Sequence, residues 1–329
     1  MELNKKIVID TKGGDKGAAA MIQGAVMALE KYPALELLLV GDAKEIEKTL
    51  AELNAPADRV EVLNAPGEIT NYDNPAEAVF RKLDSSMIKA LAALSRREDL
   101  YGLITSGNTG VLITACIRYL SGKERVRPTL AAVLPAANGG FVCLADAGAT
   151  VDCTPQVLTH FARLGSKLMQ DMYGIERPRV GLLSNGTEST KGNKLVKEAH
   201  ALLAAEGGLN FVGNVEGNTA LSGVCDVLVS DGFAGNLLLK VTEGTATRII
   251  TDAMKFAHKE GSEDVKRLVG HLMQVYDIGS LGGGMILGPC KPVIKTRGNA
   301  GPEAVVNTVG MMLNMAEKKA VFDAKKNQI

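Results

Sequence analysis

The run Ile7-Val8-Ile9-Asp10 leads through Gly13-Gly14-Asp15-Lys16 into an Ala- and Met-rich stretch that continues to Tyr32. A short apolar strand, a polar glycine loop and a helix, in this order, make one step of an α/β sheet. Such loops gather at the carboxyl edge of a parallel sheet, where the ligands of open α/β folds bind. The same step recurs at three later places: residues 102–105 into Ser106-Gly107-Asn108-Thr109-Gly110, residues 180–183 into Ser184-Asn185-Gly186-Thr187-Glu188, and residues 226–229 into Ser230-Asp231-Gly232-Phe233.

The four loops also indicate the charge of the ligand. Glycine-rich turns and helix N-termini present backbone N–H groups that the helix itself does not use, and these groups attract anions. We therefore expect an anionic ligand, phosphate above all.

The rest of the chain continues the alternation of strands and helices. Alternation of this kind predicts an α/β fold with a mainly parallel sheet and helices on both faces. Because no linker, repeat or change of composition interrupts residues 1–329, we expect a single domain with two lobes around a cleft. The expected strands are residues 7–10, 35–40, 60–63, 100–105, 129–134, 141–144, 180–183, 211–212, 227–229 and 285–294, and the expected helices are residues 17–32, 43–53, 75–97, 111–120, 155–173, 191–206 and 303–326.

The segment of about 236–277 departs from this alternation, because two long helix-like stretches meet near Gly261-Ser262. This pattern predicts a projecting helical hairpin. Three interpretations stay open for its apolar side chains: ordinary core packing, contact with a second subunit, and docking on a membrane surface. These side chains recur at helical spacing and are Ile249, Ile250, Met254, Phe256, Val265, Leu268, Val269, Leu272 and Met273.

Composition argues against several classes of protein. The 37 basic and 37 acidic residues give zero net charge, whereas proteins that bind nucleic-acid backbones carry a basic excess. Only 4% of the residues are aromatic and none is Trp, so base-stacking platforms are not expected. The five cysteines are widely spaced and lack metal-binding or CxxC spacing. Since no membrane-spanning run or signal peptide is recognisable either, we expect a cytoplasmic protein that binds no nucleic acid and no metal.

Missing motifs narrow the chemistry further. The chain has no GxxxxGK[ST] sequence, and Gly282-Gly283-Gly284 does not fit a GxGxxG fingerprint after a strand. HExxH and GxSxG are absent, and all four histidines lie within expected helices. These absences argue against an ATPase, a zinc hydrolase and a Ser-His hydrolase, and we expect no cofactor.

Each polar loop has a functional interpretation and a structural one. Gly13 and Gly14 can line an anion pocket beside Lys16, or they can simply allow a turn with positive φ. Ser106 and Thr109 offer hydroxyl groups to a ligand, or one of them is the N-cap of the next helix.

The later loops add amide and charged side chains. The nine residues from Asn185 to Asn193 are polar or Gly, and this is longer than a connection of two to six residues requires, which favours binding. Asp231 opens a further helix start, with Lys240 beyond it. Lys295 and Arg297 follow a late strand, and the planar fork of Arg297 suits a tetrahedral oxyanion, with a solvated surface position as the alternative.

Eight motifs, in this order, resemble those of the phosphate acyltransferase family called PlsX, which makes acyl phosphates for bacterial phospholipid synthesis. Each motif alone is weak, but together they span nearly the whole chain. They are Asp10 with Gly13-Gly14-Asp15, Asp84-Ser85-Ser86-Met87, Ser106-Gly107-Asn108-Thr109-Gly110, Asp146-Ala147-Gly148-Ala149 with Val151-Asp152-Cys153, Gly186-Thr187-Glu188 with Lys191-Gly192-Asn193, Gly213-Asn214-Val215-Glu216-Gly217, Asp231-Gly232-Phe233 with Gly235-Asn236 and Leu239-Lys240, and Val293-Ile294-Lys295.

This resemblance implies a three-layer α/β/α fold similar to the isocitrate and isopropylmalate dehydrogenases and to phosphotransacetylase. It implies a homodimer that transfers an acyl group from an acyl carrier protein thioester to inorganic phosphate, giving acyl phosphate and free carrier. It also implies peripheral contact with the inner face of the membrane through the helical hairpin.

The sequence departs from the family pattern in three places. Thr11-Lys12 stands where Ala-Met is usual, Ser184-Asn185-Gly186 where Asn-Ile-Gly is usual, and Thr296-Arg297-Gly298 where His-Gly is usual. The third change exchanges a titratable ring for a permanent cation, which bears on the acyl substrate.

We expect bound phosphate to attack the thioester carbonyl directly, which requires positioning and oxyanion donors but no Ser-His pair. Three alternatives stay open: a transferase that uses a short-chain acyl-CoA or another carrier, a dehydrogenase suggested by fold analogy alone, and a catalytically silent scaffold. The expected catalytic residues are Asn185, Lys191, Asp231, Lys295 and Arg297. The expected substrate- and phosphate-binding residues are Asp10, Gly13, Gly14, Asp15, Ser106, Gly107, Asn108, Thr109, Gly186, Thr187, Glu188, Asn193, Gly232 and Asn236.

Overall fold

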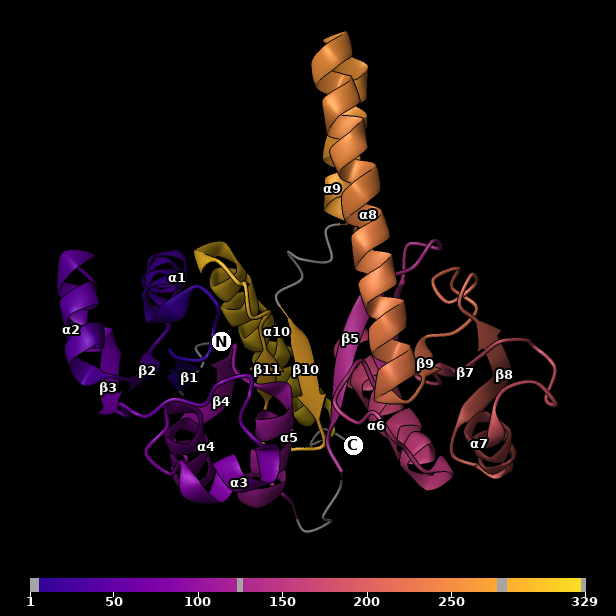
Figure 1. Cartoon of the computed structure of the whole chain (residues 1–329), viewed down its shortest axis with the longest axis horizontal. Coiled ribbons are helices and arrows are strands. Elements are labelled where there is room, and N and C mark those ends of the chain that lie inside the picture. Colours follow the sequence, from indigo (N-terminus) through magenta and orange to yellow (C-terminus); the bar gives the residue numbers. More distant parts are fainter. Residues whose placement is uncertain (1–5, 123–126, 277–282, 327–329) are drawn as a thin grey trace. The chain divides into compact units, whose positions relative to one another are not determined.

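The computed structural model describes residues 6–122, 127–276 and 283–326 and shows an α/β protein (Figure 1). The chain divides into two compact units: unit 1 combines Met1–Leu130 with Gly282–Ile329, and unit 2 is Ala131–Leu281. In both units most neighbouring strands run parallel and helices alternate with them along the chain. The expected fold class is therefore confirmed.

Unit 1 contains six sheet strands, in the order β3-β2-β1-β4-β11-β10. Its strands run parallel except β10, which pairs antiparallel with β11. Helices α1 and α10 pack against one another above this sheet, whereas α4 and α5 lie below it in the view of Figure 1. The elements are β1 (Lys6–Asp10), α1 (Gly17–Lys31), β2 (Leu37–Gly41), α2 (Ala43–Glu52), the 3₁₀ helix η1 (Ala57–Arg59), β3 (Val60–Asn64), α3 (Pro75–Arg81), α4 (Ser86–Arg96), β4 (Leu100–Thr105), α5 (Thr109–Tyr119), β10 (Gly284–Leu287), β11 (Val293–Lys295) and α10 (Pro302–Lys326).

Unit 2 contains five sheet strands, in the order β5-β6-β9-β7-β8. Strands β6, β9, β7 and β8 run parallel, and β5 pairs antiparallel with β6. Helices α6 and α7 pack against one another and against this sheet. The elements are β5 (Thr129–Pro135), β6 (Phe141–Ala145), α6 (Pro155–Tyr173), β7 (Arg179–Ser184), α7 (Lys194–Ala205), β8 (Asn210–Glu216), β9 (Val227–Val229), α8 (Gly232–Glu260) and α9 (Glu263–Tyr276).

The central strands are apolar because helices cover both faces of the sheet. Ile7, Val8 and Ile9 of β1 are completely buried, as is the run Leu37–Val40 of β2. Continuous apolar runs of this kind are typical of parallel strands with no solvent-facing side. The driving force for unit 1 is therefore burial of these side chains between the two helical layers.

Helix boundaries follow the capping side chains. Asp42, Thr154 and Asn193 accept backbone N–H hydrogen bonds at the starts of α2, α6 and α7. Gly174 and Gly261 end α6 and α8 in the left-handed conformation, with φ of 68° and 69°. These caps explain why most helices end within a few residues of the expected positions.

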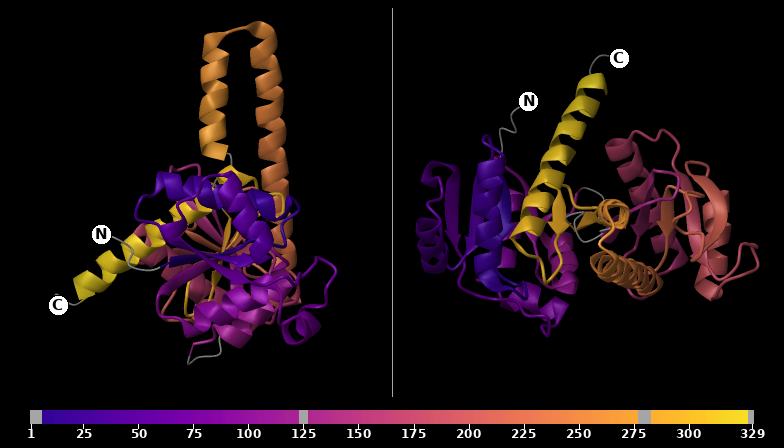
Figure 2. Two further views of the ribbon diagram at one scale, coloured as in Figure 1. Left: turned by 90° about the vertical axis from the view of Figure 1, so that its left-hand side faces the viewer. Right: turned by 90° about the horizontal axis from the view of Figure 1, so that it is seen from above.

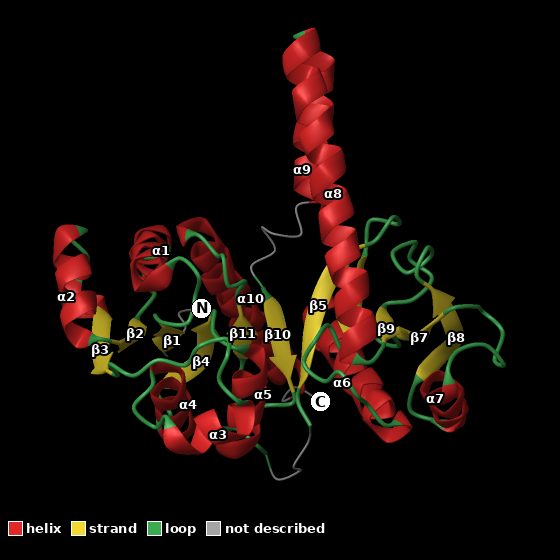
Figure 3. Ribbon diagram, viewed as in Figure 1, coloured by secondary structure: helices red, strands yellow, loops and turns green. Residues whose placement is uncertain are grey.

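Two elements that were expected to be continuous are each divided in the structure (Figure 3). The single helix expected at 75–97 is divided into α3 and α4, because the Ser85 hydroxyl donates to Lys82 O (2.7 Å) and the chain here bridges to Gly67. The single strand expected at 285–294 is divided into β10 and β11, because Gly288 has a φ of 106° and Pro289 and Pro292 lack backbone N–H groups.

Helices α8 and α9 form an antiparallel pair within unit 2 (Figure 2). Several apolar side chains of the pair are exposed, among them Ile249 and Phe256 on α8 and Leu268 on α9, each more than half exposed. Val269 and Ala257 are buried, which fits packing of α9 on α8. No helix in the described ranges combines the length and apolar composition of a membrane-crossing segment.

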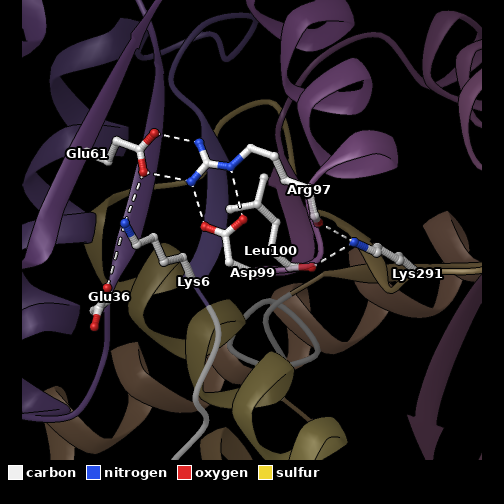
Figure 4. Close-up of polar contacts among 7 residues, drawn as sticks. All are labelled: Lys6, Glu36, Glu61, Arg97, Asp99, Leu100 and Lys291. Carbon is white, nitrogen blue, oxygen red and sulfur yellow. Dashed lines mark hydrogen bonds and ion pairs between the residues drawn. The ribbon is translucent and has the colours of Figure 1, made fainter.

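A network of charged side chains joins the amino ends of the unit 1 strands (Figure 4). Arg97 makes two hydrogen bonds to the Glu61 carboxylate (2.5 and 2.9 Å) and two to Asp99 (3.0 and 2.6 Å). Lys6 Nζ donates to Glu61 at 3.0 Å. Hydrogen bonds from Arg97 lower the pKa of Glu61 to about 2. The network lies at the edge opposite to the glycine loops, so we assign it a structural role.

Candidate functional site

The candidate site in unit 1 lies at the carboxyl ends of β1, β4 and β11. These strands are neighbours and run parallel, so Asp10, Thr105 and Lys295 all end at one edge of the sheet. The strand order reverses between β1 and β4, because β2 and β3 lie on one side of β1 and β4 lies on the other. Strands β1 and β4 therefore flank a topological switch point, where open α/β sheets bind ligands.

Three loops meet at this edge: loop 1 (residues 11–16), loop 2 (residues 106–108) and loop 3 (residues 296–301). Two backbone hydrogen bonds hold loop 3 in place. Thr296 N–H donates to Thr105 O at the end of β4 (2.8 Å), and Asp15 N–H of loop 1 donates to Gly298 O (2.7 Å). The structure thus brings together ten of the expected residues, namely Asp10, Gly13, Gly14, Asp15, Ser106, Gly107, Asn108, Thr109, Lys295 and Arg297.

A buried carboxylate links the first two strands. The Thr105 hydroxyl donates to Asp10 Oδ2 at 2.7 Å, and the same hydroxyl oxygen accepts the Gly107 N–H at 3.1 Å. The other carboxylate oxygen of Asp10 accepts the Lys12 N–H at 3.2 Å. Asp10 is 1% exposed, and burial raises the pKa of its carboxyl to about 6, although hydrogen bonds from Ser86, Thr105 and Lys12 act in the opposite direction.

Glycines allow loops 1 and 2 to approach one another closely. A Cβ atom on Gly13, which has a φ of 88°, would lie 2.9 Å from the Gly107 Cα. A Cβ atom on Gly14 would lie 2.7 Å from the Ser106 Oγ. The Ser106 hydroxyl is buried and has no hydrogen-bond partner within the described residues. A buried hydroxyl without a partner is costly, and it can be satisfied by a ligand oxygen.

The N-cap of α5 is Asn108, not Ser106 or Thr109 as the structural interpretation of this loop supposed. Asn108 Oδ1 accepts the Val111 N–H at 3.1 Å, and Asn108 Nδ2 donates to Thr70 O at 3.1 Å. Both ends of the Asn108 side chain are therefore used within the protein. The Ser106 hydroxyl, one residue after β4, is not used as a cap and stays available to a ligand where loops 1 and 2 approach one another.

In unit 2, a second buried carboxylate organises the turn that follows β6. Asp146 accepts backbone N–H groups from Gly148 (3.2 Å), Ala149 (3.0 Å) and Thr150 (2.5 Å). Thr150 O accepts the Gly232 N–H at 2.7 Å, which ties this turn to the start of α8. A Cβ atom on Gly148 would lie 3.3 Å from the Asn236 side chain. Two expected residues, Gly232 and Asn236, therefore lie against residues 146–150.

Asp231 is the N-cap of α8. Its carboxylate accepts the Ala234 N–H at 2.7 Å, and its side chain is partly exposed. This contact accounts for an acidic residue at the position, because a carboxylate at a helix N-terminus both caps the backbone and interacts favourably with the helix dipole.

Loop 4 (residues 185–193) follows β7, which runs parallel to β9, so the loop lies at the same edge of the unit 2 sheet. Asn185 Oδ1 accepts the Gly192 N–H at 2.9 Å and so closes the loop on itself. Asn214 Nδ2 donates to Glu188 O at 2.8 Å, and His200 Nδ1 lies 3.0 Å from Asn214 Oδ1. The remaining expected residues of this loop are exposed, apart from the buried Gly186, and comprise Asn185, Thr187, Glu188, Lys191 and Asn193.

The two sets of expected residues belong to different units, and their union in one site stays a prediction. Sequence reasoning missed Thr105 and Ser86 as partners of Asp10, and Asp146 and Asn214 as braces of the unit 2 loops. The only available signal was that Ser86, Asp146 and Asn214 belong to the quoted family motifs. Within the described ranges, no group of three or more His, Cys, Asp or Glu side chains could hold a metal ion.

Comparison with solved structures identifies the fold. The EutD phosphotransacetylase from Staphylococcus aureus is 15% identical with a TM-score of 0.62, covering 96% of this chain and 95% of that one. A phosphotransacetylase from Streptococcus pyogenes is 17% identical with a TM-score of 0.63, covering 96% of this chain and 94% of that one. At these identities the similarity establishes a shared fold.

Sequence comparison identifies the family. A family model described as "Fatty acid synthesis protein" matches residues 5–322. The phosphate acyltransferase of Streptococcus agalactiae is 38% identical over an alignment of 328 residues that covers 96% of this chain and 97% of the relative. That of Halothermothrix orenii is 37% identical over an alignment of 323 residues that covers 96% of each chain. The full-length agreement with both confirms the resemblance read from the motifs, and this protein belongs to the phosphate acyltransferase family of fatty acid synthesis proteins.

Proposed function

We propose that this protein is a phosphate acyltransferase that moves an acyl group from an acyl carrier protein thioester to inorganic phosphate. The product, an acyl phosphate, enters phospholipid synthesis. Full-length membership of the phosphate acyltransferase family is the observation that carries this proposal.

The reaction needs little from the protein beyond positioning and charge stabilisation. A phosphate oxygen attacks the thioester carbonyl carbon and forms a tetrahedral oxyanion, after which the carbon–sulfur bond breaks and the carrier leaves as a thiol with a proton from the phosphate or solvent. Phosphate is itself the nucleophile, so no Ser-His pair is required. Rate enhancement then depends on how well phosphate and the oxyanion are held.

Phosphate is held, in this proposal, by loops 1, 2 and 3 of unit 1. Three features support this placement: the switch-point position, the close glycine contacts, and the buried Ser106 hydroxyl that has no partner within the described residues. Backbone N–H groups of Gly13 and Gly14 and the side chains of Lys295 and Arg297 supply positive potential. Loop 4 and the start of α8, with Asn185, Lys191 and Asp231, are proposed to position the thioester and its oxyanion.

The hairpin of α8 and α9 is proposed to contact a second subunit or a membrane surface. Its exposed apolar side chains support an external contact, and they disfavour the core-packing interpretation for Ile249, Met254, Phe256, Leu268 and Met273, which are between 42% and 56% exposed. We propose a homodimer in the cytoplasm with peripheral contact at the inner face of the membrane. Sedimentation velocity and flotation with anionic vesicles test the two contacts separately.

The donor is tested by measuring release of free thiol with acyl carrier protein and acyl-CoA donors side by side, with and without phosphate. The proposal expects phosphate-dependent turnover that is faster with the acyl carrier protein donor. Faster turnover with a short-chain acyl-CoA would assign the protein a phosphotransacetylase-like activity. Absence of turnover with every donor would favour a silent scaffold.

A further inference from the structure

We propose that Asp10 acts in the reaction as a positioning residue through Thr105, and does not contact phosphate. The pair fixes the Ser106-Gly107 segment so that loop 2 presents the Ser106 hydroxyl to phosphate. This inference rests on the proposed function and assigns a specific role to two buried side chains at the switch point.

The hydrogen bonds of the pair have a defined direction. A threonine hydroxyl carries one hydrogen, and here it is committed to Asp10 Oδ2 at 2.7 Å. The lone pairs of the same oxygen are then free to accept the Gly107 N–H at 3.1 Å. An ionised Asp10 therefore determines which way the Thr105 hydroxyl points, and the hydroxyl in turn fixes the Gly107 peptide.

Asp10 is poorly placed to be a phosphate ligand. Its oxygens accept hydrogen bonds from Thr105 and Lys12, and the Ser86 hydroxyl also bonds to the carboxyl group. An ionised carboxylate has no hydrogen to donate, and two anions in contact in a buried place repel one another strongly. The carboxylate is thus separated from the proposed anion position by the hydroxyl and peptide that it orients.

A small movement of Gly107 would be transmitted to loop 1. The Gly107 Cα lies 2.9 Å from the position of a Cβ on Gly13, so the two backbones are in direct contact. Met87 Cε also lies against Gly107, which leaves little room on that side. Loss of the Thr105 hydroxyl would therefore disturb the N–H groups of loop 1 together with the Ser106 hydroxyl.

Protonation of Asp10 weakens this arrangement. Burial raises its pKa to about 6, and the nearby Glu68 carboxylate acts in the same direction. The amino group of Lys12, in loop 1, is bound to Pro66 O at 2.9 Å. As pH falls through about 6, the carboxylate becomes a weaker acceptor, so the Thr105 hydroxyl is no longer held in one direction.

The experiment compares Thr105→Val, which keeps the shape and removes the hydroxyl, with Thr105→Ser, which keeps the hydroxyl. Thr129→Val is the matched control, because Thr129 is also completely buried and its hydroxyl has no partner within the described residues. The Michaelis constant for phosphate should rise about tenfold or more in Thr105→Val, the loss expected for one oriented hydrogen bond. It should stay within about threefold in Thr105→Ser and within about twofold in Thr129→Val, as expected for conservative changes away from that bond.

A pH profile separates positioning from a purely structural role. Dividing kcat/KM for phosphate of the wild type by that of Thr105→Val cancels the effect of phosphate ionisation, which is the same for both proteins. This ratio should fall as pH drops through about 6, following protonation of Asp10. Asp10→Asn keeps the shape of the side chain and should remove that pH step, so it serves as the second variant if Thr105→Val folds poorly. A phosphate Michaelis constant that is unchanged in Thr105→Val, or a pH step that persists in Asp10→Asn, overturns the inference.

Calorimetric titration with inorganic phosphate alone distinguishes this inference from the proposed function. If Gly14→Ala weakens phosphate binding and Thr105→Val does not, the positioning role is wrong and the phosphate placement stands. If neither variant changes phosphate binding, the placement of phosphate in unit 1 is wrong and the inference falls with it. Weaker binding in both variants supports the two together.

Discussion

Gly14 and Ser106 are in contact where loops 1 and 2 cross, and a Cβ atom on residue 14 would lie 2.7 Å from the Ser106 Oγ. The same Cβ atom would lie 3.3 Å from Gly298 O in loop 3. Residue 14 is therefore the point where all three loops of the proposed phosphate site meet. Any side chain there must displace either the Ser106 hydroxyl or the backbone of loop 3.

Gly14→Ala should raise the Michaelis constant for phosphate about tenfold or more, because the added methyl group pushes Ser106 out of position. Steady-state kinetics at varied phosphate concentration measure this effect. Gly122→Ala is the matched control, since nothing lies within 4 Å of a Cβ at that residue. Equal Michaelis constants in the two variants would mean that the loop crossing does not hold phosphate.

Ser106→Ala should separate binding from stability. In the free protein the buried Ser106 hydroxyl has no partner within the described residues, so its removal should leave the free energy of unfolding unchanged or raise it by about 1 kcal/mol. The phosphate Michaelis constant should nevertheless rise about tenfold, because the hydroxyl is proposed to donate to phosphate. Denaturant unfolding and kinetics on the same preparation give both quantities. A variant that is destabilised but binds phosphate normally would contradict this role.

Much of this region could be predicted from the sequence, because its signals are local. The apolar run of β1, the following glycines and the helix beyond them are adjacent in the chain, and the structure has them where expected. The contact between Asp10 and Thr105 could not be predicted, because it joins residues 95 positions apart and depends on β1 and β4 being neighbours. Burial of the carboxylate, which decides its chemistry, follows only from that pairing.

Turn chemistry explains the elements that sequence reasoning misjudged. Helical periodicity continues across residues 82–85, but the Ser85 hydroxyl bonds to Lys82 O and the chain turns there. At residues 106–109 both Ser and Thr are good N-caps, yet Asn108 takes the position, because a cap depends on where the backbone leaves the strand. Such choices between neighbouring candidates are made by tertiary packing.

Arg97→Met should lower the free energy of unfolding by about 1 kcal/mol, a modest value because Arg97 and Glu61 are each about one-third exposed and solvent screens them. The pKa of Glu61 lies at about 2, below its usual 4.5, so this stabilisation is fully present above pH 4.5 and is lost as pH falls toward 2. The difference in stability between wild type and variant should shrink over that range. Denaturant unfolding at several pH values measures it, and a difference that is independent of pH would contradict the assignment. Because the network lies at the opposite edge of the sheet, kcat/KM should be unchanged.

Gly232→Ala should destabilise unit 2 by about 2 kcal/mol or more, because the new Cβ would lie 2.6 Å from Thr150 O and 2.8 Å from Asp146 Oδ2. Gly244→Ala, in the same helix α8, meets nothing within 4 Å and should stabilise by about 0.5–1 kcal/mol through helix propensity. Thermal unfolding of the two variants tests the close packing of α8 on residues 146–150. Equal effects of the two changes would show that this packing is loose.

The central claim is that phosphate itself receives the acyl group. Incubation of the purified protein with an acyl carrier protein thioester and radiolabelled inorganic phosphate tests it most directly. The account predicts one labelled acyl phosphate for every carrier thiol released. Thiol release without incorporation of label would show that water is the acceptor, and would contradict the account.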